Sequence, residues 1–120
     1  MERRNFRQIG AGGEDLAVSF LAERGFEVLE RNYRFGRAGE IDLIVRKGNL
    51  VVFVEVKSRN TPVYGGPLYA INQRKKQTLR LVAAQFLSRR PDLDSRDIVF
   101  RFDMIAVSGG AVEWIEDILR

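Results

Sequence analysis

Acidic side chains and a lysine lie within two of the most apolar segments of the sequence. Glu40 and Asp42 belong to the stretch 39–45, and Glu55 and Lys57 belong to the stretch 51–57. Burying a carboxylate or an ammonium group costs several kcal/mol unless the group is paired or binds a metal ion. A metal-dependent active site would offset this cost, so these residues mark a candidate functional site.

A β-hairpin is expected to bring these residues together. Gly48 and Asn49 form a two-residue turn signal of type I′ or II′. In the register that this turn sets, directly opposite side chains share a face, with Cβ atoms about 4.5–5.5 Å apart. The opposed pairs are Lys47 and Leu50, Asp42 and Glu55, and Glu40 and Lys57. The other face is expected to be apolar, with Ile41, Leu43, Val45, Val52, Val54 and Val56.

Two opposed carboxylates repel each other unless a proton or a divalent cation lies between them. Oxygen ligands of this kind suit Mg²⁺ or Mn²⁺, which also bind water and phosphate. Lys57, two residues beyond Glu55, could contact an attacking water or a phosphate oxygen, and these groups together can hydrolyse a phosphodiester. A salt-bridge cluster at the strand end, with Glu40 paired to Lys57, explains the hairpin equally well.

The spacing of these residues resembles the core motif of the PD-(D/E)xK nucleases. Asp42 is followed thirteen positions later by Glu55-Val56-Lys57, although Ile41 stands where the nominal motif has proline. A closer resemblance, over about residues 12–107, is to the bacterial YraN-like family of predicted endonucleases, which is similar to archaeal Holliday-junction resolvases. The segments that carry it are Gly12-Gly13-Glu14-Asp15-Leu16-Ala17, Gly39-Glu40-Ile41-Asp42 and Phe53-Val54-Glu55-Val56-Lys57.

The resemblance implies a restriction-endonuclease-like fold, Mg²⁺ or Mn²⁺ as cofactor, and a homodimer that acts on DNA, including branched DNA. The expected site residues are Asp42 and Glu55 as metal ligands with the Val56 carbonyl, Lys57 at the water, Glu14 on a metal-bound water, and Glu40 in support. It also matches Arg74 and Lys75 to basic positions that hold the DNA backbone. Without the family, Glu14 is interpreted as a first-turn acid that favours the helix dipole.

The charge distribution favours a polyanionic partner. The chain carries a net charge of +4, and its last ten residues contribute −2 (three acids against one arginine), so the preceding residues carry +6. Basic clusters on both sides of an acidic metal site fit nucleic acid, because phosphates need cations everywhere except at the metal. Solvated surface charge remains the better interpretation for any single arginine. The residues expected to contact nucleic acid are Arg34, Arg37, Arg74 and Lys75.

Several classes of function are excluded by composition. The sequence has no cysteine and no histidine, which excludes disulfides, thiolate chemistry, His-dependent triads and HNH-type nuclease chemistry. Residues 1–5 lack the apolar region of a signal peptide, and no apolar run approaches the length of a membrane span. We therefore expect a cytoplasmic protein with no membrane partner.

The elements that would position the site follow from periodicity and caps. Helices are expected over residues 13–24 and 72–87, the second capped by Asn72, and strands over 26–33, 98–107 and 112–115 in addition to the hairpin. This αβββαβ order predicts one α/β domain over residues 1–120, a central mixed sheet flanked by helices, with the strand at 98–107 parallel to the Glu55 strand. Asp103 lies in that strand, outside the expected ligand set.

The sequence is compatible with three functional hypotheses. The first is a metal-dependent endodeoxyribonuclease that acts in DNA recombination or repair. The second is a non-catalytic nucleic-acid-binding module of nuclease descent, and the third is an interface salt network between subunits. Tyr64 and Tyr69, in the Gly/Pro-rich segment 58–70, could stack on splayed bases or anchor that segment.

Overall fold

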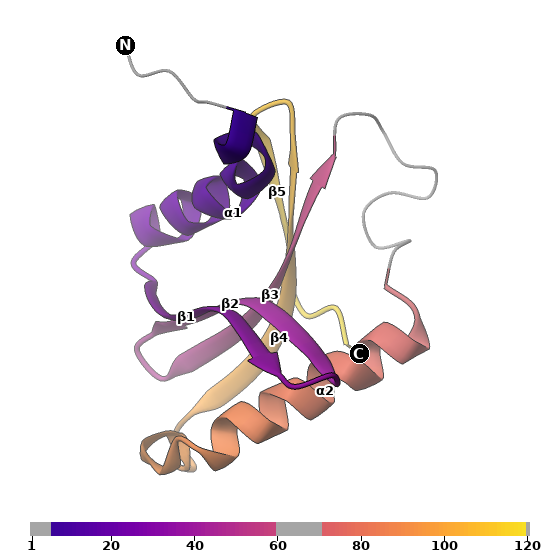
Figure 1. Cartoon of the computed structure of the whole chain (residues 1–120). Helices are drawn as coiled ribbons and strands as arrows, with labels where there is room; N and C mark the ends of the chain where they lie inside the picture. The colour runs from indigo at the N-terminus through magenta and orange to yellow at the C-terminus, as the bar shows by residue number, and fades with distance from the viewer. Residues whose placement is uncertain (1–5, 60–70, 120) are drawn as a thin grey trace.

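Five strands form one mixed sheet between two helices (Figure 1). The computed structural model describes residues 6–59 and 71–119, with side chains described for 13–58 and 71–119. In chain order the elements are α1 (Phe6–Glu23), β1 (Glu27–Phe35), β2 (Gly39–Lys47), β3 (Leu50–Arg59), α2 (Gln73–Ser88), the 3₁₀ helix η2 (Pro91–Leu93), β4 (Val99–Ser108) and β5 (Ala111–Ile115).

The strands lie in the sheet in their sequence order, and every neighbouring pair is antiparallel except β3 and β4. The parallel pair is joined through α2, as the sequence predicted for a strand–helix–strand connection. The expected α/β fold class is thus confirmed, and it is consistent with a restriction-endonuclease-like core. The first strand, expected over residues 26–33, lies at one edge of the sheet, because β1 pairs only with β2.

Each helix covers one face of the sheet, and each interface has its own apolar core (Figure 1). The core under α1 contains Ala17, Leu21, Phe26, Leu43, Val45, Val52, Val54, Ile105 and Val107. The core under α2 contains Ile41, Ile44, Val51, Phe53, Leu79, Val82, Ala83, Phe86, Leu93, Met104 and Ile118. The hairpin strands are therefore buried on both faces, as in sheets that helices cover on both sides.

This arrangement corrects the predicted apolar face of the hairpin. Leu43 and Val45 pack under α1 as expected, but Ile41 packs under α2. The regular alternation of sides is lost between Ile41 and Leu43, at Asp42, where the pairing of β2 with β3 stops. A pattern with a period of two holds only while the strand keeps its pairing and pleat.

The helix α1 begins earlier than the sequence predicted, at Phe6 rather than at residue 13. The glycine run 10–13 therefore lies inside this helix. Gly13 is buried, and a Cβ atom built on it would lie 1.8 Å from the Oγ of Ser58 on β3. The absence of a side chain at Gly13 allows α1 to approach β3 closely, which brings the next residue, Glu14, to the open end of the hairpin.

The helix α2 begins where the sequence predicted. Asn72 is its N-cap, and the Asn72 Oδ1 accepts a hydrogen bond of 2.8 Å from the amide of Lys75. Such a cap satisfies an otherwise unpaired amide of the first turn. The buried side of α2 is formed by Leu79, Val82, Ala83 and Phe86. Lys75 consequently lies in the first turn of the helix, close to the end of β3.

Asp103, on β4, stabilises the C-terminal part of the sheet. It is fully buried and accepts two hydrogen bonds from Arg101, one from Trp114 Nε1 and one from the amide of Asp117. The indole of Trp114 packs edge-to-face against Phe20 of α1. Asp103 is therefore a structural carboxylate with its own partners.

Gly39 opens β2 with a φ of +151°, and a Cβ atom there would lie 2.3 Å from the Cγ2 of Thr78 on α2. We predict that Gly39→Ala lowers the free energy of unfolding by about 2–4 kcal/mol, because backbone strain and a clash add. Gly36→Ala is the matched control, since Gly36 has a φ of +51° and no neighbour within 4 Å of its Cβ position. It should cost only about 1–2 kcal/mol; urea unfolding curves that give equal losses would contradict the packing argument.

Candidate active site

The hairpin is paired only in its half nearest the turn. Opposed residues run from Lys47 and Leu50 to Leu43 and Val54, which confirms the register predicted from the turn. Gly48 has a φ of +59°, as the first central residue of a type II′ turn requires. Beyond Leu43 and Val54, β2 and β3 no longer pair, so the hairpin is open at its far end.

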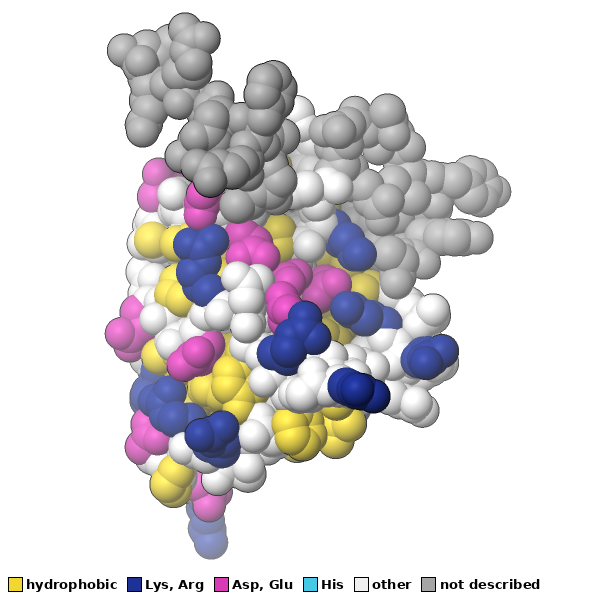
Figure 2. Space-filling view, viewed as in Figure 1, with side chains coloured by type: hydrophobic (Ala, Val, Ile, Leu, Met, Phe, Trp, Pro, Cys, Tyr) yellow, Lys and Arg dark blue, Asp and Glu magenta, His cyan; other side chains and the backbone are white. Residues whose placement is uncertain are grey.

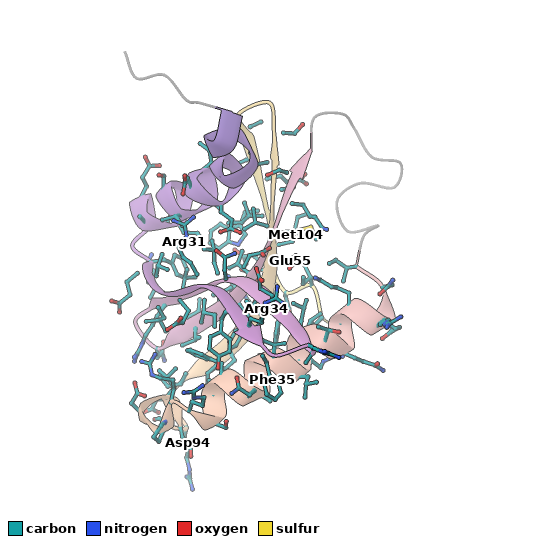
Figure 3. All side chains as sticks on the ribbon, viewed as in Figure 1. Arg31, Arg34, Phe35, Glu55, Asp94 and Met104 are labelled. Atoms are coloured by element: carbon teal, nitrogen blue, oxygen red, sulfur yellow. The ribbon has the colours of Figure 1, made fainter. Side chains whose placement is uncertain are left out.

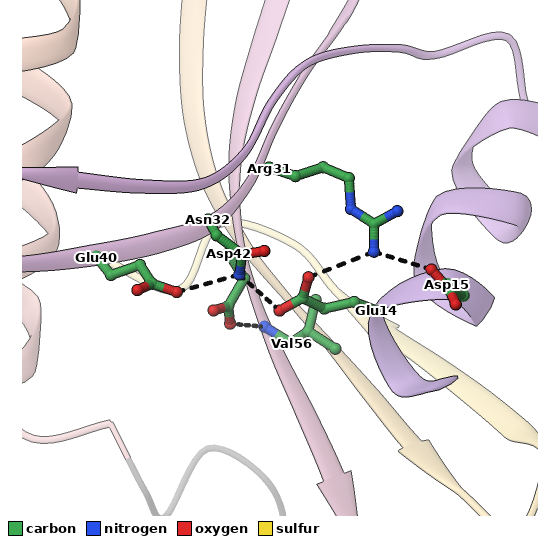
Figure 4. A network of polar contacts seen from close by, with 7 residues as sticks. All are labelled: Glu14, Asp15, Arg31, Asn32, Glu40, Asp42 and Val56. Atoms are coloured by element: carbon green, nitrogen blue, oxygen red, sulfur yellow. Dashed lines mark hydrogen bonds and ion pairs between the residues drawn. The ribbon is translucent and has the colours of Figure 1, made fainter. Parts of the chain in front are cut away.

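Where the pairing of β2 with β3 stops, the side chain of Asp42 accepts a hydrogen bond from the main chain of β3. The amide of Val56 donates a hydrogen bond of 2.8 Å to Oδ2 of Asp42 (Figure 4). Continued pairing would have placed Val56 opposite Ile41, so a carboxylate replaces the expected main-chain partner. The predicted direct opposition of Asp42 and Glu55 as paired residues is wrong for this reason, although the two carboxylates remain electrostatic neighbours.

Burial raises the pKa of Asp42 to about 7, and the negative charge of Glu55 adds to this effect. The hydrogen bond from the Val56 amide opposes the shift, while the charges of Glu14 and Glu40 increase it. The charges of three acids thus act on Asp42 at the open end of the hairpin. A carboxyl group whose pKa is raised by burial and by like charge is typical of a functional site.

Glu55 is almost fully buried, with a side chain that is 6% exposed, and its nearest partners are two lysines. Lys75 Nζ of α2 lies 3.1 Å from the Glu55 Oε2, and Lys57 Nζ lies 4.0 Å from the same oxygen. Figure 3 shows Glu55 beside Met104 in the middle of the sheet. In Figure 2, acidic side chains gather in the middle of this face with basic side chains beside them.

A chain of hydrogen bonds connects α1 to β2 through β1 (Figure 4). Asn32 Nδ2 donates to Oε2 of Glu14 at 2.9 Å and to Oε2 of Glu40 at 3.1 Å. Arg31 Nη2 binds Oε1 of Glu14 at 3.5 Å, and Arg34 Nη2 binds Oε1 of Glu40 at 2.9 Å. The alternative pairing of Glu40 with Lys57 is therefore wrong, because arginine and amide groups of β1 bind Glu40.

Asn32 was not singled out from the sequence. It has a φ of +53° in the middle of β1, a conformation in which asparagine is several times more frequent than most residues. An asparagine flanked by strand-forming residues such as Tyr33 is a weak signal, since asparagine is depleted in strands. Only the fold reveals that its neighbours are Glu14 and Glu40.

The remaining basic candidates lie around the acids. Arg34 binds Glu40, Arg37 is exposed in the turn between β1 and β2, and Arg74 is exposed on α2. Arg74, Lys75, Asn72 and Thr78 line a shallow hollow at the start of α2. Tyr64 and Tyr69, the predicted stacking residues, lie outside the described part of the chain.

The oxygen donors at the open end of the hairpin meet the needs of a divalent cation. Among the side chains that the structure describes, no three acids converge to hold a metal ion. Mg²⁺ binds through one or two carboxylates and keeps several waters, so Asp42 and Glu55, with the carbonyl of Val56, are chemically sufficient. These oxygen donors fit Mg²⁺ or Mn²⁺, and the two lysines on Glu55 are the cations that such an ion would have to displace.

Neither of the two helices in residues 6–59 and 71–119 is long and apolar enough to cross a membrane. A family model described as "Uncharacterised protein family UPF0102" matches residues 13–107. The chain belongs to the UPF0102 family. The match includes every acid and lysine of the site: Glu14, Glu40, Asp42, Glu55, Lys57 and Lys75.

Relatives in this family are similar over nearly the whole chain. A UPF0102 protein of Halorhodospira halophila is 40% identical over 118 residues, covering 98% of this chain and 92% of its own length. A UPF0102 protein of Caldicellulosiruptor saccharolyticus is 41% identical over 103 residues, covering 86% and 84%. One of Alkaliphilus oremlandii is 44% identical over 102 residues, covering 84% and 85%. The YraN-like resemblance is thereby confirmed as family membership.

The raised pKa of Asp42 predicts a pH dependence of stability in the metal-free protein. The folded state keeps this proton up to about pH 7, whereas the unfolded chain releases it near 3.8, so stability is lost as the pH rises between these values. The loss attributable to Asp42 is on the order of 3–4 kcal/mol. Urea unfolding in EDTA at pH 4.5 and 7.5 should show this loss in the native protein and a much smaller one in Asp42→Asn; equal losses would contradict the assignment.

The ion pair of Lys75 with Glu55 predicts competition with a bound cation. Replacing Lys75 by Met should lower the dissociation constant for Mn²⁺ about five- to tenfold, because a unit positive charge 3.1 Å from Glu55 is removed. Lys76→Met removes the same charge one residue further along α2 and should change it less than twofold. Titration followed by the Mn²⁺ electron paramagnetic resonance signal measures both; equal effects would refute a specific competition.

Proposed function

We propose that this protein is a Mg²⁺- or Mn²⁺-dependent endodeoxyribonuclease that hydrolyses phosphodiester bonds. The observation that carries the proposal is that Asp42 and Glu55 are electrostatic neighbours at the open end of the hairpin, with Lys57 beside Glu55. Two carboxylates confined together at this depth are stabilised by a divalent cation. The PD-(D/E)xK resemblance of the same three residues supports the same chemistry.

In this proposal Asp42, Glu55 and the carbonyl of Val56 hold the cation. A bound divalent cation would lower the pKa of a water and neutralise charge on the phosphate. Lys57, whose side chain is 33% exposed, donates hydrogen bonds to the attacking water or to a phosphate oxygen. Glu14 and Glu40 support the site through waters, which fits their partial exposure of 22% and 29%.

The DNA backbone is proposed to lie across the basic side chains around the acids. Arg37 and Arg74 are exposed, and Arg34 extends from Glu40 with a side chain that is 62% exposed. The N-terminus of α2 adds partial positive charge beside Lys75. Branched DNA as substrate and a homodimer as the acting form are the parts of the proposal that the resolvase resemblance supports.

The second candidate function is a non-catalytic nucleic-acid-binding module. One observation favours it: Lys75 and Lys57 already neutralise Glu55. A site that has lost its metal would keep a buried carboxylate only with such partners. Divalent-ion binding and turnover separate the two functions.

The proposal predicts metal-dependent cleavage that needs Asp42 and Lys57. Labelled four-way-junction, flap, duplex and single-stranded DNA are incubated with Mg²⁺ or Mn²⁺, and with EDTA in parallel. Asp42→Asn and Lys57→Met should each reduce the cleavage rate at least about a hundredfold, because each removes a group acting at the reacting phosphate. The ranking of the four DNA forms identifies the preferred substrate.

Matched controls separate the site from general effects of charge. Asp97→Asn, beside the hairpin turn, and Lys47→Met, at the turn end of the same hairpin, remove one acid and one lysine at the end of the hairpin opposite to Asp42. Both should keep the native rate. A different result would favour the binding module over the nuclease. In that case no metal would support cleavage, and salt-sensitive DNA binding would be the same in the native protein and in the Asp42 and Lys57 variants.

A further inference from the structure

Asn32 is the one non-glycine residue with a positive φ inside a strand among the residues that the structure describes. It lies opposite Asp42 in the pairing of β1 with β2, between the pairs Arg31–Leu43 and Tyr33–Ile41. A left-handed backbone conformation costs a non-glycine residue about 1–3 kcal/mol and persists when surrounding contacts enforce it. Such an outlier beside a candidate site points to a function for its side chain.

The contacts of the Asn32 side chain identify what the conformation achieves. Its amide nitrogen binds one oxygen of Glu14 and one of Glu40, at 2.9 and 3.1 Å. The other oxygen of each carboxylate binds an arginine, Arg31 for Glu14 and Arg34 for Glu40. Figure 4 shows Asn32 and Asp42 between the two glutamates. The amide therefore holds one oxygen of each carboxylate near Asp42, while the arginines bind the other oxygen of each.

The chemistry of the amide explains why a neutral residue lies at this position. A lysine or arginine between Glu14 and Glu40 would also hold them, but it would cancel their charge beside Asp42. An amide donates two hydrogen bonds and carries no net charge. The amide thus adds no positive charge on the side of Asp42, whose pKa both glutamates raise, while their arginine partners bind the other oxygens.

We propose that Asn32 is a positioning residue of the active site, which holds Glu14 and Glu40 as a charged pair around the cation at Asp42. This role rests on the proposed function, because it requires a divalent cation at Asp42 and Glu55. Asn32 acts through the two glutamates, which would hold waters of a cation bound at Asp42. Partners of this outer kind commonly change metal affinity by ten- to a hundredfold when they are removed.

The test removes the amide without disturbing the backbone. Asn32→Gly accepts a φ of +53° without strain, so its urea unfolding midpoint should stay at or above that of the native protein. Its dissociation constant for Mn²⁺, measured by electron paramagnetic resonance, should rise about tenfold. Asn49→Gly is the matched control, because it removes an amide that binds the Asp97 carbonyl at the opposite end of the hairpin; its Mn²⁺ affinity should be native.

A double-mutant cycle identifies the route of the effect. In a Glu14→Gln, Glu40→Gln background, Asn32→Gly should cause no further loss of Mn²⁺ affinity, since the pair it holds is already neutral. Native affinity in the Asn32→Gly single variant, or an undiminished loss in the double-glutamine background, would overturn the positioning role while leaving the nuclease proposal intact. Absence of Mn²⁺ binding in the native protein itself would instead remove both proposals.

Discussion

The arrangement of this protein depends on one hydrogen bond, from the amide of Val56 to the carboxylate of Asp42. It replaces a main-chain bond and coincides with the end of pairing between β2 and β3. Beyond it β2 remains paired with β1, and β3 with β4, so Glu40 lies on one strand and Glu55 and Lys57 on the other where the two strands no longer pair with each other. The bond also orients Asp42 within a buried setting, where its pKa is raised. A strand interruption that aims a side chain in this way is common beside functional sites.

The rest of the fold brings charges to this interruption from both faces of the sheet. The close approach of α1 at Gly13 delivers Glu14, and the capped start of α2 delivers Lys75 to Glu55. The two apolar cores fix the helices against β2 and β3, so the ionisable groups are held by packing rather than by their own attraction. On one side of the site, the neutral side chain of Asn32 binds the acids Glu14 and Glu40. On the other side, the cationic Lys75 pairs with Glu55.

Much of this could be predicted from local sequence signals. The turn at Gly48 and the cap at Asn72 gave the hairpin register and the start of α2, because such signals act within a few residues. The change of side at Ile41 could not be predicted, since it follows from a side chain that interrupts a ladder. The contacts of Asn32 and of Lys75 depend on how β1 and α2 lie against the hairpin, and no local pattern encodes that placement. The family resemblance supplied Glu14, which the residues alone did not favour.

In the proposed site, the carboxylates of Asp42 and Glu55 share a divalent cation. The most direct measurement is a crystal soaked in Mn²⁺, with anomalous diffraction used to locate the metal. We expect an anomalous peak about 2.0–2.3 Å from one oxygen of each carboxylate, with the Lys75 Nζ displaced from the 3.1 Å contact that it makes with Glu55. If saturating Mn²⁺ gives no peak between the two carboxylates and Lys75 remains paired with Glu55, the shared cation site is contradicted.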